Sequence, residues 1–103
     1  MASDKEYLEY IMDQLPDGVS YRPMMGEYVI YYRDKVAGGI YDDRFLVKPV
    51  AAAQGLMPQA HSEIPYDGAK PMLLVDNVED REFLRELMEA MYDQLPATKK
   101  RKK

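Results

Sequence analysis

Apolar residues recur at helical spacing near both ends of the chain. Near the N-terminus they predict a helix over about residues 4–14, which must end before Pro16. Ser3 and Glu6 have the spacing of a capping box at its start. A second helix is predicted after Asp76 and Asn77, which we expect to cap it. The two apolar stripes are Tyr7, Leu8, Ile11, Met12 and Leu15, and then Phe83, Leu84, Leu87, Met88 and Met91.

Between these helices, aromatic and β-branched residues predict strands. Residues 28–32, 35–41 and 44–49 are three strands separated by two polar pairs, which indicates two consecutive hairpins. Shorter strands are predicted at residues 19–22 and 72–75. A run of strands bracketed by helices is typical of the α+β class. We therefore expect a mostly antiparallel sheet of about five strands, with the N- and C-terminal amphipathic helices packed on one face.

Two-residue turns would pair Tyr32 with Lys35 and Tyr41 with Arg44, and this register assigns each side chain to one face of the sheet. A glycine pair, Gly38-Gly39, indicates a β-bulge or a close approach by another backbone. The more apolar face is expected under the helices and consists of Glu27, Val29, Tyr31, Val36, Gly38, Ile40, Phe45 and Val47. The other face is half polar and consists of Tyr28, Ile30, Tyr32, Ala37, Gly39, Tyr41, Arg44, Leu46 and Lys48.

The half-polar face would gather Tyr28, Tyr32 and Tyr41 with Arg44 and Lys48. Aromatic side chains interleaved with cations can stack the bases of single-stranded nucleic acid. The same residue types are common hot spots in protein interfaces. Cross-strand packing that fills a half-exposed sheet is the structural alternative. The sequence leaves these three interpretations open.

Other polar residues have simpler interpretations. Arg22 either forms a structural ion pair, with Glu27 as a candidate partner, or contacts a ligand or partner. His61 lies in a predicted loop over residues 59–70, and Asp42-Asp43 lie at a hairpin tip, so we expect these side chains to be solvated. We predict no catalytic residue, no metal site and no cofactor, because no nucleophile–base pair or metal-ligand cluster is visible.

Length and composition predict one domain. The chain has 103 residues, of which 47% are hydrophobic and 31% charged, as in ordinary globular proteins. We expect the domain to span residues 1–97 and a disordered basic tail to span residues 98–103. The absence of cysteine, of a secretory signal and of an apolar run of about 20 residues predicts a cytoplasmic protein that does not enter a membrane.

The net charge of −4 hides an asymmetry along the chain. Residues 99–103 hold five of the 14 cations, so the rest of the chain has nine cations against 18 acids, a net charge of −9. An acidic body is poorly suited to wrap duplex DNA, whereas the tail can supply a weak, salt-sensitive contact with a polyanion. Lys70, at the exit of the predicted loop, can join Arg22 at an anion site.

A series of short motifs runs through the chain. They are Arg22-x-Met24-Met25-Gly26 before a strand, Lys35 after the next turn, Asp43-Arg44-x-Leu46-x-Lys48, Pro65-Tyr66, and a strand that begins at Met72. As a set they resemble the N-terminal domain of the TfoX/Sxy competence regulators, over roughly residues 3–95. That family often has Phe where Met25 stands and Gly where Asp34 stands. Its full-length members carry a second, helical domain.

The resemblance implies a non-enzymatic domain that regulates transcription in competence through protein contacts. The alternative is a nucleic-acid-binding module that uses the Tyr/Arg/Lys face and the basic tail. A nucleic-acid binder would lose affinity steeply with added salt, and a partner held by aromatic anchors would not. The sequence identifies no particular partner, and it leaves the oligomeric state open, a homodimer included.

Overall fold

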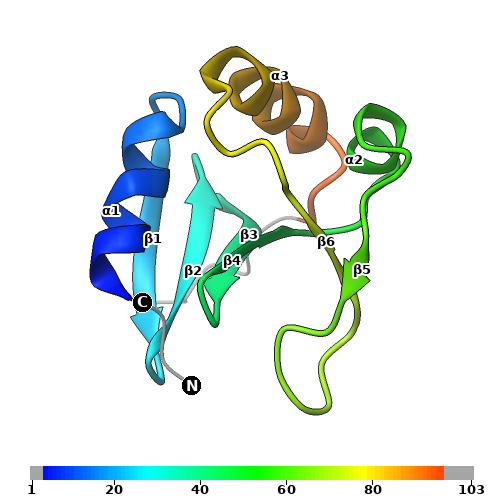
Figure 1. Cartoon of the computed structure of the whole chain (residues 1–103). Coiled ribbons are helices and arrows are strands. Elements are labelled where there is room, and N and C mark those ends of the chain that lie inside the picture. The colour runs from blue at the N-terminus through cyan, green and yellow to red at the C-terminus, as the bar shows by residue number, and fades with distance from the viewer. Residues whose placement is uncertain (1–3, 97–103) are drawn as a thin grey trace, which may run out of the picture.

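The computed structural model describes residues 4–96, and the strands form one antiparallel sheet in the order β1-β2-β3-β4-β6-β5 (Figure 1). This confirms the predicted α+β fold, with six strands where about five were expected. The additional strand, β5, lies inside the predicted loop. The elements are α1 (Lys5–Gln14), β1 (Val19–Met24), β2 (Glu27–Tyr32), β3 (Lys35–Tyr41), β4 (Arg44–Val47), α2 (Ala51–Leu56), β5 (Ser62–Glu63), β6 (Met72–Leu74) and α3 (Arg81–Tyr92). The predicted basic tail lies outside the described residues.

One hydrophobic core lies between the sheet and the helices. Figure 1 shows α1 beside β1, with α3 and α2 farther along the sheet. Burial of each large apolar side chain stabilises the fold by roughly 1.5–3 kcal/mol relative to exposure. The fully buried side chains include Leu8 and Ile11 of α1, Leu84, Leu87, Met88 and Met91 of α3, and Ile30, Ile40, Phe45 and Val47 of the sheet. Both predicted helix stripes therefore face the core.

Short acidic side chains begin the first and last helices. The Asp4 carboxylate accepts a hydrogen bond of 3.0 Å from the backbone N–H of Glu6, whereas Ser3, the predicted cap, lies outside the described residues. The Asp80 carboxylate accepts one of 3.1 Å from the Phe83 N–H. The predicted cap at Asp76 and Asn77 is therefore wrong. Asp80 donates its own backbone N–H to the Asn77 carbonyl, which forms a turn before the helix.

The hairpin turns adopt backbone angles that suit tight connections. Met25 and Gly26 have φ values of 53° and 86°, and Asp42 and Asp43 have values of 54° and 58°. Positive φ at both turn residues matches the twist of the flanking strands. The two-residue turns predicted after Tyr32 and Tyr41 are confirmed, because these residues pair with Lys35 and Arg44.

A β-bulge in β3 changes the predicted faces. Ile30 pairs with Gly38 but Tyr31 pairs with Val36, so Ala37 is an extra residue. A shift of one residue turns every following side chain to the opposite face. Pairing and burial confirm the predicted faces of β4 and of the part of β3 after the bulge. The predicted faces of β2, Val36 and Ala37 are wrong. Tyr28, Ile30 and Tyr32 lie on the helix-covered face with Ile40, Phe45 and Val47.

Both interpretations of the glycine pair are confirmed. The bulge lies directly before Gly38, and other groups approach both glycines closely. An added Cβ would stand 2.0 Å from the Leu46 carbonyl oxygen at Gly38, and 2.4 Å from a ring carbon of Tyr41 at Gly39. A side chain at Gly38 would therefore displace the β4 backbone, and one at Gly39 would displace the Tyr41 ring and the Tyr28 carbonyl of β2.

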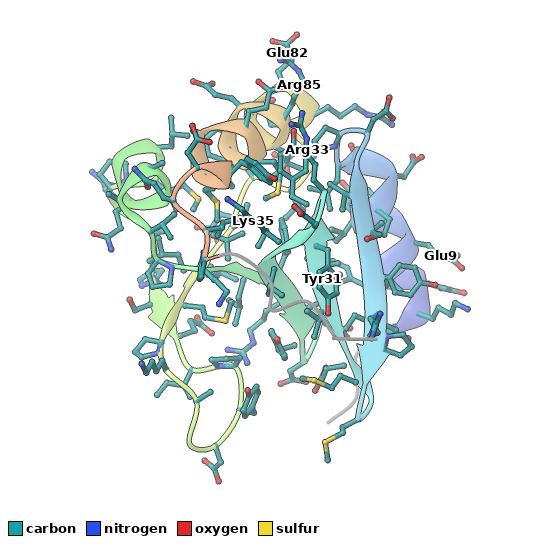
Figure 2. The ribbon with its side chains drawn as sticks, turned by 180° about the vertical axis from the view of Figure 1, so that it is seen from behind. Glu9, Tyr31, Arg33, Lys35, Glu82 and Arg85 are labelled. Atoms are coloured by element: carbon teal, nitrogen blue, oxygen red, sulfur yellow. The ribbon has the colours of Figure 1, made fainter. Side chains whose placement is uncertain are left out.

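The β2–β3 turn is fastened to the end of α3 through Tyr92. The Tyr92 hydroxyl donates a hydrogen bond of 3.0 Å to the Asp34 carboxylate. The Lys35 ammonium donates one of 3.0 Å to the Tyr92 carbonyl and lies 4.1 Å from the centre of its ring. A cation at a helix C-terminus also complements the helix dipole. Figure 2 shows Lys35 and Arg33 beside α3, and the Arg33 guanidinium lies 5.4 Å from the Tyr92 ring centre.

This fastening should make stability sensitive to alkaline pH. The hydrogen bond to Asp34 and partial burial raise the pKa of Tyr92 above its usual value of 10.0. The unfolded chain therefore loses this proton at lower pH than the folded chain does, and the free energy of unfolding falls as pH rises past about 10. Urea melts of wild type and Tyr92→Phe from neutral to alkaline pH should show a shallower fall in the variant. Identical slopes would contradict this role.

Candidate functional site

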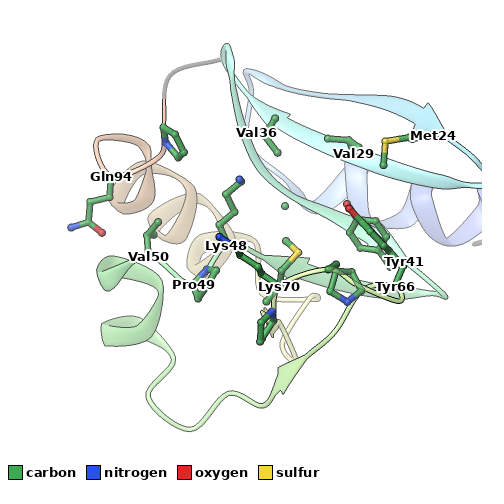
Figure 3. Close-up of a pocket in the computed structure, with 16 residues that line it drawn as sticks. Met24, Val29, Val36, Tyr41, Lys48, Pro49, Val50, Tyr66, Lys70 and Gln94 are labelled. Carbon is green, nitrogen blue, oxygen red and sulfur yellow. The ribbon is translucent and has the colours of Figure 1, made fainter. Parts of the chain in front are cut away.

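The sheet face opposite the helices holds a hollow of about 600 Å³, which we call the open-face hollow (Figure 3). Four parts of the fold enclose it. The sheet contributes Met24, Val29, Val36, Gly38, Tyr41 and Met72. The segment between β5 and β6 contributes Pro65, Tyr66, Ala69, Lys70 and Pro71. The residues after β4 and after α3 contribute Lys48, Pro49, Val50, Gln94 and Pro96.

Apolar side chains dominate this lining, and chain neighbours of the lining residues are exposed apolar residues as well. Met25, directly after Met24 in the β1–β2 turn, is 96% exposed. Ile64 and Tyr66, which flank Pro65, are 52% and 53% exposed. Contiguous exposed apolar groups rimmed by polar ones are typical of interaction surfaces, and methionine adapts its shape to different partners.

Tyr41 forms one wall of the hollow. Its ring lies over Gly39, where an added Cβ would stand only 2.4 Å from the ring, and it is 6% exposed. The ring of Tyr66 lies next to it, with 5.8 Å between the ring centres. Burial, then the neighbouring Tyr66 and Glu27, raises the pKa of Tyr41 above 10.0, so its hydroxyl keeps its proton at neutral pH. Figure 3 shows the two rings together at one end of the hollow.

Arg44 holds the segment that carries Tyr66. Its guanidinium is paired with the Glu63 carboxylate of β5 and donates a hydrogen bond of 3.1 Å to the Tyr41 carbonyl. A weaker contact of 3.5 Å reaches the Ile64 carbonyl. Arg44 therefore joins the β3–β4 hairpin to the segment between β5 and β6. Its partners make it a positioning residue for the rim of the hollow.

Removing this connection should loosen the rim without unfolding the protein. Because the Arg44–Glu63 pair is about one-third exposed, we expect Arg44→Ala to lower the free energy of unfolding by only about 1 kcal/mol. Amide hydrogen exchange over residues 61–70 should accelerate in the variant. Arg85→Ala is the control, because the Arg85–Glu89 pair is exposed and 3.9 Å long. Unchanged exchange over residues 61–70 would show that Arg44 does not hold the segment.

The predicted tyrosine cluster does not form, because the bulge separates its members. Tyr32 is 2% exposed in the core, edge to face with Tyr92, and Tyr28 packs on the same helix-covered face. Tyr41 and Arg44 lie on the opposite face. Of the predicted partner-binding residues, only Tyr41 and Lys48 line the open-face hollow.

Arg22 is exposed on the edge strand β1. Its guanidinium lies 6.0 Å from the centre of the Tyr31 ring, on the same face as the hollow but outside its lining. The Glu27 carboxylate accepts a hydrogen bond of 3.0 Å from the backbone N–H of Asp42. Lys70 lines the hollow together with Lys48, whereas Arg22, with which it was predicted to form an anion site, does not.

The remaining candidate residues lie on the surface. His61, Asp42 and Asp43 are exposed, as predicted. Asp43 accepts a hydrogen bond of 2.7 Å from the backbone N–H of Asp4, and so helps to fix the start of α1. Within residues 4–96, no three acidic or histidine side chains gather as a metal site would require. In the same part of the chain, no helix is long and apolar enough to span a bilayer.

The sequence of one relative matches nearly the whole chain. A protein of Spirochaeta aurantia, named as an uncharacterized 12.7 kDa protein in the trpE 5′ region, is 34% identical over 105 residues. The match covers 99% of the chain and 91% of the relative. The chain belongs to the family of this Spirochaeta aurantia protein. No model of a known protein family matches the chain, and no solved structure does.

The residues of the motifs singled out in the sequence fall into two groups in the structure. Met24, Lys48, Pro65 and Tyr66 line the open-face hollow, although they are far apart in the sequence. The others lie elsewhere: Arg22 on β1, Met25 and Gly26 in the β1–β2 turn, Lys35 against Tyr92, and Leu46 fully buried in β4.

Several lining residues were not predicted from the sequence. Val36 was expected under the helices and turns to the hollow only because of the bulge after it. Gln94 and Pro96 follow α3, and the Gln94 side chain accepts a hydrogen bond of 2.6 Å from the Ala52 N–H, which holds this segment against α2. Nothing in the local sequence indicates that contact, because its partners are 42 residues apart.

Proposed function

We propose that this chain is a non-enzymatic interaction domain that binds a protein partner in the open-face hollow. The proposal rests on one observation. Four residues of the motifs that resemble the TfoX/Sxy N-terminal domain, Met24, Lys48, Pro65 and Tyr66, line one hollow although they come from three separate segments. By the same resemblance, the role we propose for the contact is regulatory, in the control of competence genes.

The chemistry of the hollow favours a protein partner over nucleic acid. Base stacking on a sheet needs several exposed aromatic rings beside cations. Here Tyr28 and Tyr32 lie on the helix-covered face and Tyr41 is nearly buried, which leaves Tyr66 as the exposed ring at the hollow. Methionine, proline and valine supply the remaining apolar lining, and apolar pockets with an aromatic rim are typical anchoring points in protein interfaces.

Affinity capture from a native lysate tests this function. Tyr66→Ser removes an exposed ring at the hollow, and Tyr10→Ser removes a ring of similar exposure, 42%, on α1. A protein retained by wild type should be retained by Tyr10→Ser and lost with Tyr66→Ser, with or without nuclease. If both variants lose the captured protein equally, the proposed site is contradicted. If nuclease treatment abolishes capture by wild type, the result would favour nucleic acid as the partner.

A further inference from the structure

The lining of the open-face hollow is positive although the body of the protein is acidic. Outside residues 99–103, 18 acids oppose nine cations. Among the described residues that line the hollow, two are lysines, Lys48 and Lys70, and none is an acid. Charge of opposite sign to the surroundings at a concave surface attracts ligands of complementary charge.

Both lysines are available to a ligand. Within residues 4–96, no hydrogen bond or ion pair engages either ammonium group. By contrast, Arg44 and Lys35 form hydrogen bonds or ion pairs with other groups of the same chain. Lys48 is half-buried and Lys70 is exposed, and both line the hollow. Figure 3 shows both at the hollow, with Met24, Val29 and Val36 across from them.

The apolar surface is too extended for a small anion alone. Met25 follows Met24 in the chain and Ile64 precedes Pro65, and both are more than half exposed, as is Tyr66 in the lining. An occupant that covers these groups must carry several apolar side chains as well as negative charge. An extended peptide can present both, because alternate side chains point in opposite directions.

We infer that the open-face hollow takes an extended acidic segment of a partner protein, with carboxylates at Lys48 and Lys70 and apolar side chains against Met24, Val36 and Tyr66. This inference rests on the proposed function and specifies the chemistry of the partner.

Selection from a random peptide library tests the inference, with the full chain as bait. We expect the selected peptides to combine Asp or Glu with Phe, Leu, Ile or Met. Fluorescence anisotropy with a labelled selected peptide should show binding that Lys48→Glu and Lys70→Glu each weaken by on the order of tenfold. Lys5 is exposed on α1, and Lys5→Glu makes the same change of charge there. This control variant should alter affinity less than about twofold.

The outcomes separate the two proposals. Selected peptides that are neutral or basic, but still lose binding with Tyr66→Ser, would overturn the acidic partner and leave the hollow as a protein-binding site. Failure to select any peptide sensitive to Tyr66→Ser would overturn both. Stronger binding of a single-stranded oligothymidine than of any peptide, weakened by Lys48→Glu, would overturn both in favour of nucleic acid. Circular dichroism and urea melts of each variant establish that it remains folded.

Discussion

Replacing Gly38 with alanine should destabilise the protein by about 3 kcal/mol or more. The added Cβ would stand 2.0 Å from the Leu46 carbonyl oxygen and 2.8 Å from the Val47 Cα. Both atoms belong to the backbone of β4, so no side chain can rotate away to make room. Inserting an atom into a packed region costs about 1–3 kcal/mol when neighbours can adjust, and more when they cannot. The urea midpoint should fall sharply.

Gly55→Ala provides the matched control. Gly55 lies within α2, and apart from its chain neighbours and the helix backbone, no atom lies within 4 Å of the place where its Cβ would stand. Because alanine favours helix more than glycine does, this variant should gain about 0.5–1 kcal/mol. The same substitution at two glycines should therefore shift the urea midpoint in opposite directions. An unchanged midpoint for Gly38→Ala would show that β3 and β4 are not paired as described.

Truncation of Leu87 should have the second large effect. Leu87 is fully buried on the face of α3 that meets the core, with Leu84, Met88 and Met91. Removing its side chain beyond Cβ takes away apolar contacts and leaves a cavity, which together cost about 2–5 kcal/mol. Urea melts of Leu87→Ala should show this loss with little change in slope.

Substitutions of Glu86 and Phe83 on the same helix provide comparisons for Leu87→Ala. Glu86 is exposed, so Glu86→Ala should change the free energy of unfolding by less than about 0.5 kcal/mol. Phe83 is half-buried at the edge of the core, and Phe83→Ala should fall between the two. Equal effects at Leu87 and Glu86 would mean that α3 presents a different face to the sheet.

Local patterns were sufficient to predict most of the elements. The helices at both ends follow from apolar spacing, and the three strands of the meander follow from two polar pairs between aromatic and β-branched runs. Cap positions were less certain, because Asp76, Asn77 and Asp80 all have side chains that can cap a helix. Tertiary packing of α3 decides between them, and periodicity does not contain that information.

Side-chain direction could not be predicted across the bulge. The glycines at positions 38 and 39 indicated an irregularity, yet its position in the register decides which face of β2 is buried. One extra residue, Ala37, turned Tyr28 and Tyr32 towards the helices and turned Val29 away from them. The predicted tyrosine cluster required regular pairing throughout, and for that reason it was wrong.

The open-face hollow was beyond local prediction for a different reason. Its walls come from segments that are distant in the sequence and meet only through contacts such as Arg44 with Glu63 and Gln94 with Ala52. The sequence placed Tyr41 and Lys48 on one predicted sheet face, but it gave no sign that Pro65 and Tyr66 join them at one surface. Convergence of this kind depends on the whole sheet topology.

Methyl NMR during titration with a selected peptide tests the central claim most directly. Met24, Val29, Val36 and Met72 carry methyl groups at the open-face hollow, whereas Met88 and Leu87 carry them in the helix-covered core. If the hollow is the binding surface, the methyl signals of the first group should shift progressively as peptide is added. The methyl signals of the second group should stay nearly unchanged. Shifts confined to other surfaces, with the hollow methyl groups unmoved at saturation, would contradict the claim.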